Sequence, residues 1–125
     1  FSTTLYRNGK PETIAANQNG QRGAFGDDLF VADAKRFIRE HREEPFFIYL
    51  ALRTPHKTLE APADAMKAFE GKFQETAFGG DSQTGTVRTP RAARAAMITH
   101  LDKNVLQVLA LLKELHRSRD GWGPG

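Results

Sequence analysis

Residues 46–52 read FFIYLAL, an unbroken apolar run that directly follows Pro45. A strand with one solvated face alternates apolar and polar residues, so this run predicts a strand buried on both faces, as in a parallel sheet covered by helices. The polar stretch from Arg53 to His56 comes next. Ligands of open α/β sheets bind beyond the carboxyl ends of the strands, so we expect this stretch to lie at a binding site.

A helical period precedes the run, from about Leu29 to Arg42. One face is apolar and holds Phe30, Ala34, Phe37, Ile38 and His41. Asp27 or Asp28 is expected to cap its start, and Pro45 ends it because the residue before a proline disfavours the helical conformation. A helix followed directly by a buried strand is half of a β-α-β unit, which indicates an α/β fold.

The strongest period lies near the C-terminus. Thr89-Pro90 predicts an N-cap and a first helical residue, and the helix is expected to reach about His116. Its apolar stripe consists of Met97, Leu101, Val105, Val108, Leu112 and Leu115. At about 1.5 Å per residue this helix spans roughly 39 Å, so it requires a large sheet as its packing surface.

Turn signals predict the shorter elements. Asn8-Gly9 favours a β-hairpin, and residues 16–26 are expected to form an irregular loop. A short helix is predicted over residues 62–70, between Pro62 and Gly71. Residues 71–88 are predicted to form a long loop that Phe73 and Phe78 attach to the body.

Composition excludes several function classes. The chain has no cysteine, which rules out disulfides, thiol nucleophiles and cysteine-ligated metals. It contains no apolar run long enough to cross a membrane. The net charge of +3 is too small to indicate nucleic acid, although Arg88, Arg91 and Arg94 form a basic cluster that we interpret as a solvated helix face.

His56 is the main candidate for chemistry. An imidazole at the end of a strand can bind an anionic group or transfer a proton to a leaving group, and the alternative is a loop histidine bonded to nearby backbone. The other histidines, His41, His100 and His116, show no metal-ligand spacing and are expected to pack or cap helices. The carboxylate pairs are interpreted as a helix cap, at Asp27-Asp28, and as solvated surface, at Glu43-Glu44.

The segment from Pro45 to Pro62, PFFIYLALRTPHKTLEAP, resembles the middle region of the sulfatases, the arylsulfatase-type members of the alkaline-phosphatase-like superfamily. The shared features are a PFFxYL strand, a TPH turn at residues 54–56, and then Leu59 and Pro62. The preceding helix, the following loop and the long helix also resemble the family, in the same order.

The resemblance implies a three-layer α/β sandwich with a mostly parallel sheet, in an enzyme that hydrolyses sulfate esters. Such enzymes use a formylglycine made within a C/S-x-P-S-R motif and a calcium ion. The resemblance also implies that His56 contacts the sulfate group, and so binds substrate, and helps to protonate the leaving oxygen. The partner it implies is a small-molecule or glycan sulfate ester, with neither nucleic acid nor membrane; the oligomeric state is left open. Family members are often periplasmic, secreted or lysosomal.

The sequence also departs from the family. It lacks the C/S-x-P-S-R motif and the aspartate motifs for calcium, so no metal ligand is expected here. We therefore expect residues 1–117 to be the central part of a sulfatase catalytic domain, inactive alone, and residues 118–125 to be a tail that does not belong to the family. Leu106 stands where the family often has glycine. Two alternatives remain: a phosphodiesterase or phosphonate hydrolase of the same superfamily, and a non-catalytic interaction module.

Overall fold

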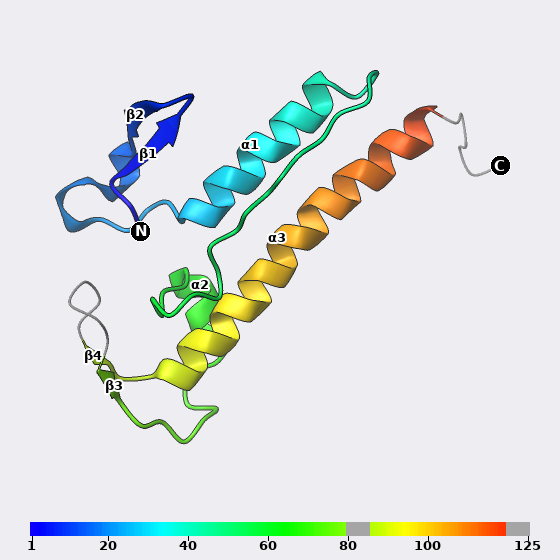
Figure 1. Ribbon diagram of the computed structural model, residues 1–125. Helices are drawn as coiled ribbons and strands as arrows, with labels where there is room; N and C mark the ends of the chain where they lie inside the picture. The colour runs from blue at the N-terminus through cyan, green and yellow to red at the C-terminus, as the bar shows by residue number, and fades with distance from the viewer. Residues whose placement is uncertain (80–85, 120–125) are drawn as a thin grey trace.

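The computed structural model describes residues 1–79 and 86–119. Its main elements are two helices, α1 (Gly26–Glu40) and α3 (Pro90–Arg119). They lie side by side and run in the same direction, since residues near the start of α1 contact His100 and Asn104 while Lys35 contacts Gln107 (Figure 1). Both helices were predicted, and α3 begins at Pro90 as its N1 proline indicates.

The N-terminal hairpin is also confirmed. β1 (Thr4–Arg7) pairs with β2 (Lys10–Thr13) in antiparallel register around Asn8-Gly9. Both turn residues have positive φ, 52° and 77°, which is the geometry that Asn-Gly favours. Arg7 ties the hairpin to α1 through Asp33 at 2.8 Å, and its hydrogen bonds to Asp33 and Glu12 raise the pKa of the Arg7 guanidinium.

The region after the hairpin is more ordered than predicted. A 3-10 helix, η1 (Ala15–Gly20), replaces part of the expected loop, although its backbone departs from helical geometry at Gln18 and Asn19. Asn17 is buried and organises the segment, because its amide donates to the carbonyls of Ser2 and Ala24 and accepts from the Ala24 N–H. The glycine-rich composition gave no sign of this side-chain scaffold.

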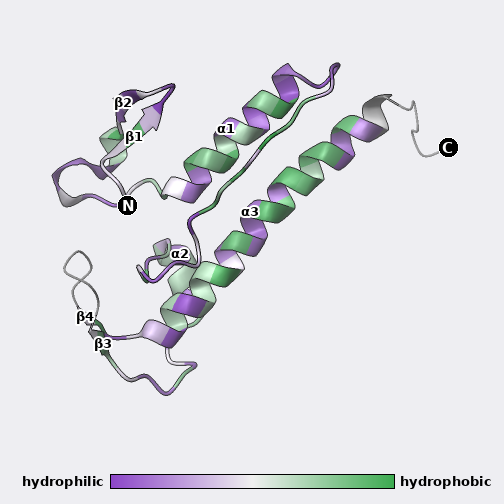
Figure 2. Ribbon diagram, viewed as in Figure 1, coloured by the Kyte–Doolittle hydropathy of each residue, from purple (hydrophilic) through white to green (hydrophobic). Residues whose placement is uncertain are grey.

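The prediction of a strand over residues 46–52 is wrong for the described structure. The segment is extended and lies along α1, but it has no strand partner among the described residues. Phe47 and Tyr49 are 86% and 84% exposed, so the segment is not buried on both faces. In Figure 2 it is a largely hydrophobic trace that runs alongside α1. A strand needs at least one hydrogen-bonded neighbouring strand, and the described part of the chain supplies none for this segment.

The remaining sheet is small. β3 (Phe78–Gly79) pairs with β4 (Thr86–Val87) in antiparallel register. The described residues therefore contain two short antiparallel sheets rather than a parallel one. Phe73 stacks on Phe69, with ring centroids 6.3 Å apart, but Phe78 is exposed and does not attach the loop to the body.

The core lies where α2 (Ala63–Lys67) meets the first turns of α3. Ala61, Ala96 and Met97 form its centre, with Leu59, Ala65, Met66 and Phe69 around them. α2 is shorter than predicted, and the turns after it lead to Gly71, whose φ of 69° suits glycine. α3 continues to Arg119, so the first two residues of the predicted tail are helical, and residues 120–125 lie outside the described residues.

Candidate functional site

The TPH turn, residues 54–56, follows the extended apolar segment and is fixed by α1. Asp27 is 1% exposed, and its Oδ1 accepts from the Arg53 N–H at 3.1 Å. Its Oδ2 accepts from the Thr54 N–H at 3.0 Å and from the Thr54 hydroxyl at 2.6 Å. Both carboxylate oxygens are thus used to hold the backbone just before His56.

α3 holds the other side of the turn. The Arg94 guanidinium donates to the Pro55 carbonyl at 3.0 Å, and the Thr54–Pro55 peptide bond is cis. The turn closes through a hydrogen bond from the His56 N–H to the Arg53 carbonyl at 3.1 Å. Two helices that are far apart in the sequence therefore position one three-residue turn.

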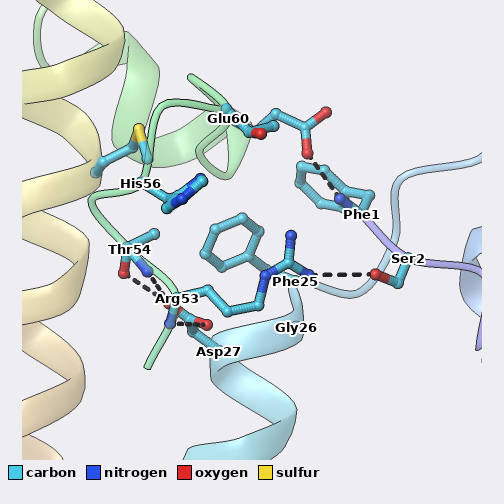
Figure 3. A pocket seen from close by; sticks show the side chains of 11 residues that line it. Phe1, Ser2, Phe25, Gly26, Asp27, Arg53, Thr54, His56 and Glu60 are labelled. Atoms are coloured by element: carbon cyan, nitrogen blue, oxygen red, sulfur yellow. Dashed lines mark hydrogen bonds and ion pairs between the residues drawn. The ribbon is translucent and has the colours of Figure 1, made fainter. Parts of the chain in front are cut away.

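The His56 side chain is exposed and lines a small pocket of about 30 Å³. Figure 3 shows the imidazole beside Phe25, with Arg53 and Asp27 below it and Glu60 and Phe1 on the far side. The volume is about that of one water molecule. The pocket is therefore too small to enclose a sulfate ester.

Charged groups surround this pocket. Arg53 reaches the Ser2 hydroxyl at 3.3 Å, and Glu60 pairs with the Phe1 amine at 2.8 Å and with Arg22 at 3.0 Å. The imidazole of His56 makes no hydrogen bond within the described part of the chain. It is therefore free to meet a ligand, in contrast to a loop histidine bonded to nearby backbone.

The prediction that Asp27 or Asp28 caps α1 is wrong. The helix begins at Gly26, three residues before the predicted start at about Leu29. Its N-cap is Phe25, and neither carboxylate caps it. Asp28 instead accepts from His100 Nε2 at 2.6 Å and from the Asn104 amide at 2.9 Å. The sequence pattern correctly placed both aspartates near the start of a helix. Their hydrogen bonds, however, reach residues far away in the sequence, and a local pattern cannot predict such contacts.

His41 and His100 pack or cap helices as expected, whereas His116 is an exposed residue of α3. His41 is the C-cap of α1 and stacks on Phe37, with ring centroids 4.0 Å apart. His100 is buried and packs edge-on against Phe25. Of the basic cluster, Arg91 bonds the Gln74 carbonyl and Arg94 the Pro55 carbonyl, so these two side chains bind the chain itself rather than form a bare solvated face.

The residues around this site do not suit calcium. Calcium takes about six to eight oxygen ligands, and carboxylates usually supply several. Across residues 1–79 and 86–119, no three His, Asp or Glu side chains converge as metal ligands. Both oxygens of Asp27 are occupied by hydrogen bonds, and Asp28 is bonded to α3. The chain also lacks the C/S-x-P-S-R motif within which formylglycine is made.

No helix in the described regions is long and apolar enough to span a membrane. In a comparison with known protein families, residues 1–122 match the family model described as Sulfatase. This family has an alkaline-phosphatase-like α/β fold and acts in general as hydrolases of sulfate esters. The match covers nearly all of the 125 residues, and the chain therefore belongs to the sulfatase family.

Proposed function

We propose that this chain forms part of the catalytic region of an enzyme that hydrolyses sulfate esters, with His56 contacting the sulfate group. One observation carries the proposal. The turn before His56 is fixed by a fully buried carboxylate, while the imidazole itself is exposed and unbonded. Rigid backbone that presents a free polar side chain is the arrangement that catalytic positioning requires.

In this proposal His56 acts by hydrogen bonding and proton transfer. The imidazole donates to a sulfate oxygen in the bound ester and passes a proton to the ester oxygen as the S–O bond breaks. Protonation turns an alkoxide or phenoxide into a neutral alcohol or phenol, which is a better leaving group. Asp27 and Arg94 keep the turn in place while this occurs.

The nucleophile is not among these residues. The chain lacks the C/S-x-P-S-R motif, and residues 1–79 and 86–119 hold no set of carboxylates suited to calcium. Membership of the sulfatase family supports a mostly parallel sheet in the complete domain, which the described residues alone do not form. We therefore expect the chain alone to be inactive. Calcium-dependent turnover of an aryl sulfate by the pure 125-residue chain would contradict this.

The test of the proposal starts with the coding sequence on both sides of the segment. We expect C/S-x-P-S-R upstream and Asp-Asn/His-Gly downstream in one reading frame. In the protein so encoded, His56→Ala is expected to lower kcat/KM for an aryl sulfate by about 10²- to 10⁴-fold, as for loss of a general acid. His116→Ala, which alters an exposed position on α3, is the matched control.

Two outcomes decide between the hypotheses. A frame that opens near Phe1 and closes at Gly125 would remove the catalytic role of His56 and favour an interaction module. A complete protein that cleaves phosphodiesters or phosphonates faster than sulfate esters would move the activity to a related branch of the superfamily.

A further inference from the structure

A second polar groove lies between α1 and α3, separate from the pocket of His56. It encloses about 460 Å³, and its polar lining is Asp28, Lys35, Arg39, His100, Lys103 and Gln107. The α1 residues recur at helical spacing, as do those of α3, so each helix contributes one continuous face. No residue lines both this groove and the pocket of His56.

The groove carries unpaired positive charge. Lys35, Arg39 and Lys103 form no ion pair within the described residues, and only Lys35 makes a hydrogen bond, to Gln107 at 3.3 Å. The one carboxylate of the lining, Asp28, is bonded to His100 and Asn104. The groove therefore presents more positive than negative charge.

Other cations of this region are paired. Arg36 contacts Asp33 at 3.0 Å, and Arg42 contacts Glu43 at 3.0 Å. An ordinary solvated helix face interleaves both signs in this way. Among the described residues that line the groove, three cations stand against one carboxylate, that of Asp28, which is already bonded to His100 and Asn104.

The groove also lies on a different face of α1 from the apolar segment. Residues 47–51 line an open cleft together with the α1 residues Phe30, Asp33, Ala34, Arg36 and Phe37. The polar groove instead uses the α1 residues Asp28, Ala32, Lys35 and Arg39. At 100° per residue these two sets lie on opposite sides of the helix. Further chain packed on the apolar side leaves the groove open. Apolar chain over the groove itself would leave three charges buried without partners, at a high cost in free energy.

The geometry points to an anion-binding groove, one that takes a ligand bearing several sulfate or phosphate groups. Arg39 offers a planar fork for two oxygens of one such group, and the two lysines offer flexible point charges on opposite walls. His100 and Asn104, both buried and bonded to Asp28, fix the floor between the helices. This site does not depend on hydrolysis at His56.

The test titrates the full chain with sucrose octasulfate and, separately, with inositol hexakisphosphate, using calorimetry at low and at physiological salt. The groove variant Lys35→Gln/Arg39→Gln/Lys103→Gln is compared with Lys10→Gln/Lys67→Gln/Lys113→Gln. The control removes the same charge from exposed positions outside the groove. We expect the groove variant to weaken binding at least about tenfold and to reduce its salt dependence. The control should change it less than about twofold.

Lysine acetylation of the unaltered chain gives a second readout that needs no variant. The bound probe should protect Lys35 and Lys103 but leave Lys10 and Lys67 reactive. Preference for one probe identifies sulfate or phosphate groups as the ligand chemistry. Three results would contradict the proposal that the groove binds anions. They are equal loss of probe affinity in the two triple variants, equal protection of all lysines from acetylation, and probe binding that does not saturate.

Discussion

Asp27 is the residue on which the position of His56 depends most directly. Both of its carboxylate oxygens accept hydrogen bonds from Arg53 and Thr54, which follow it by more than 25 positions in the chain. A buried carboxylate is costly unless hydrogen bonds replace its hydration, and here three donors do so. The same bonds restrict the turn that presents the imidazole, so stability and positioning rest on one side chain.

Asp27→Asn tests this directly. The amide keeps the shape of the carboxylate but faces a donor group toward backbone or hydroxyl donors, so at least one buried bond is lost. We expect the free energy of unfolding to fall by about 1–3 kcal/mol, measured by urea denaturation. Asp64→Asn, at an exposed position of α2, is the control and should change the free energy of unfolding by less than about 0.5 kcal/mol. Equal effects of the two substitutions would show that the hydrogen bonds of Asp27 to Arg53 and Thr54 do not contribute to the stability of the fold.

At this scale the sequence predicted His56 but not its support. The TPH turn and its place after an apolar run could be recognised because both are local. Asp27 and Arg94 reach the turn from other segments, and a residue type alone does not tell a helix cap from a tertiary clamp. Asn17 was missed for the same reason, since it lies in a stretch with the composition of a loop.

At the scale of elements, the position of α3 was predicted but its packing face was not. The predicted stripe includes Val105 and Leu112, which are exposed, whereas Ala93, Ala96 and Asn104 are buried. A pattern of large apolar residues does not reveal that alanine and asparagine are buried. Small side chains are nevertheless suited to a helix interface, because they allow two helices to approach closely. Figure 2 accordingly shows hydrophobic colour along much of α3, including residues that face away from the described core.

Two adjacent residues of α3, one buried and one exposed, allow a test of which face of the helix packs on the core. Met97 is 1% exposed and Ile98 is 51% exposed. We expect Met97→Ala to lower the free energy of unfolding by about 2–5 kcal/mol because it opens a cavity at the centre of the core. Ile98→Ala should change it by less than about 1 kcal/mol. Denaturation of the two variants under one condition gives both values, and a larger loss for Ile98→Ala would place the core on the other face.

The polar contact between α1 and α3 allows a second test. A double-mutant cycle on Asp28→Asn and His100→Gln should give a coupling energy of about 0.5–3 kcal/mol, because the histidine is buried and the contact is 2.6 Å. The exposed pair of Asp33 and Arg36 is the control, with an expected coupling of about 0.2–0.5 kcal/mol. Coupling in the first pair no greater than in the control would mean that the network does not join the helices.

At the scale of the whole molecule, the described residues bury little apolar volume and expose a great deal. Five of the nine buried hydrophobic residues are alanines, while Phe47, Tyr49 and Leu109 are among the large apolar side chains left exposed. The apolar run still has the composition of a buried strand. Its environment could not be derived from composition, because burial depends on partner strands that the described residues do not provide.

This imbalance predicts how the pure chain behaves. We expect marginal stability, with a broad thermal transition, and self-association through residues 46–52, because an extended apolar segment with unpaired backbone groups recruits further strands. Phe47→Lys/Tyr49→Lys should reduce light scattering at a given protein concentration, since each lysine opposes edge-to-edge pairing. Tyr6→Lys, at an exposed position on the hairpin, is the matched control and should leave the scattering nearly unchanged. A sharp cooperative transition in a monomeric sample would contradict this account, because it requires a core larger than the described residues form.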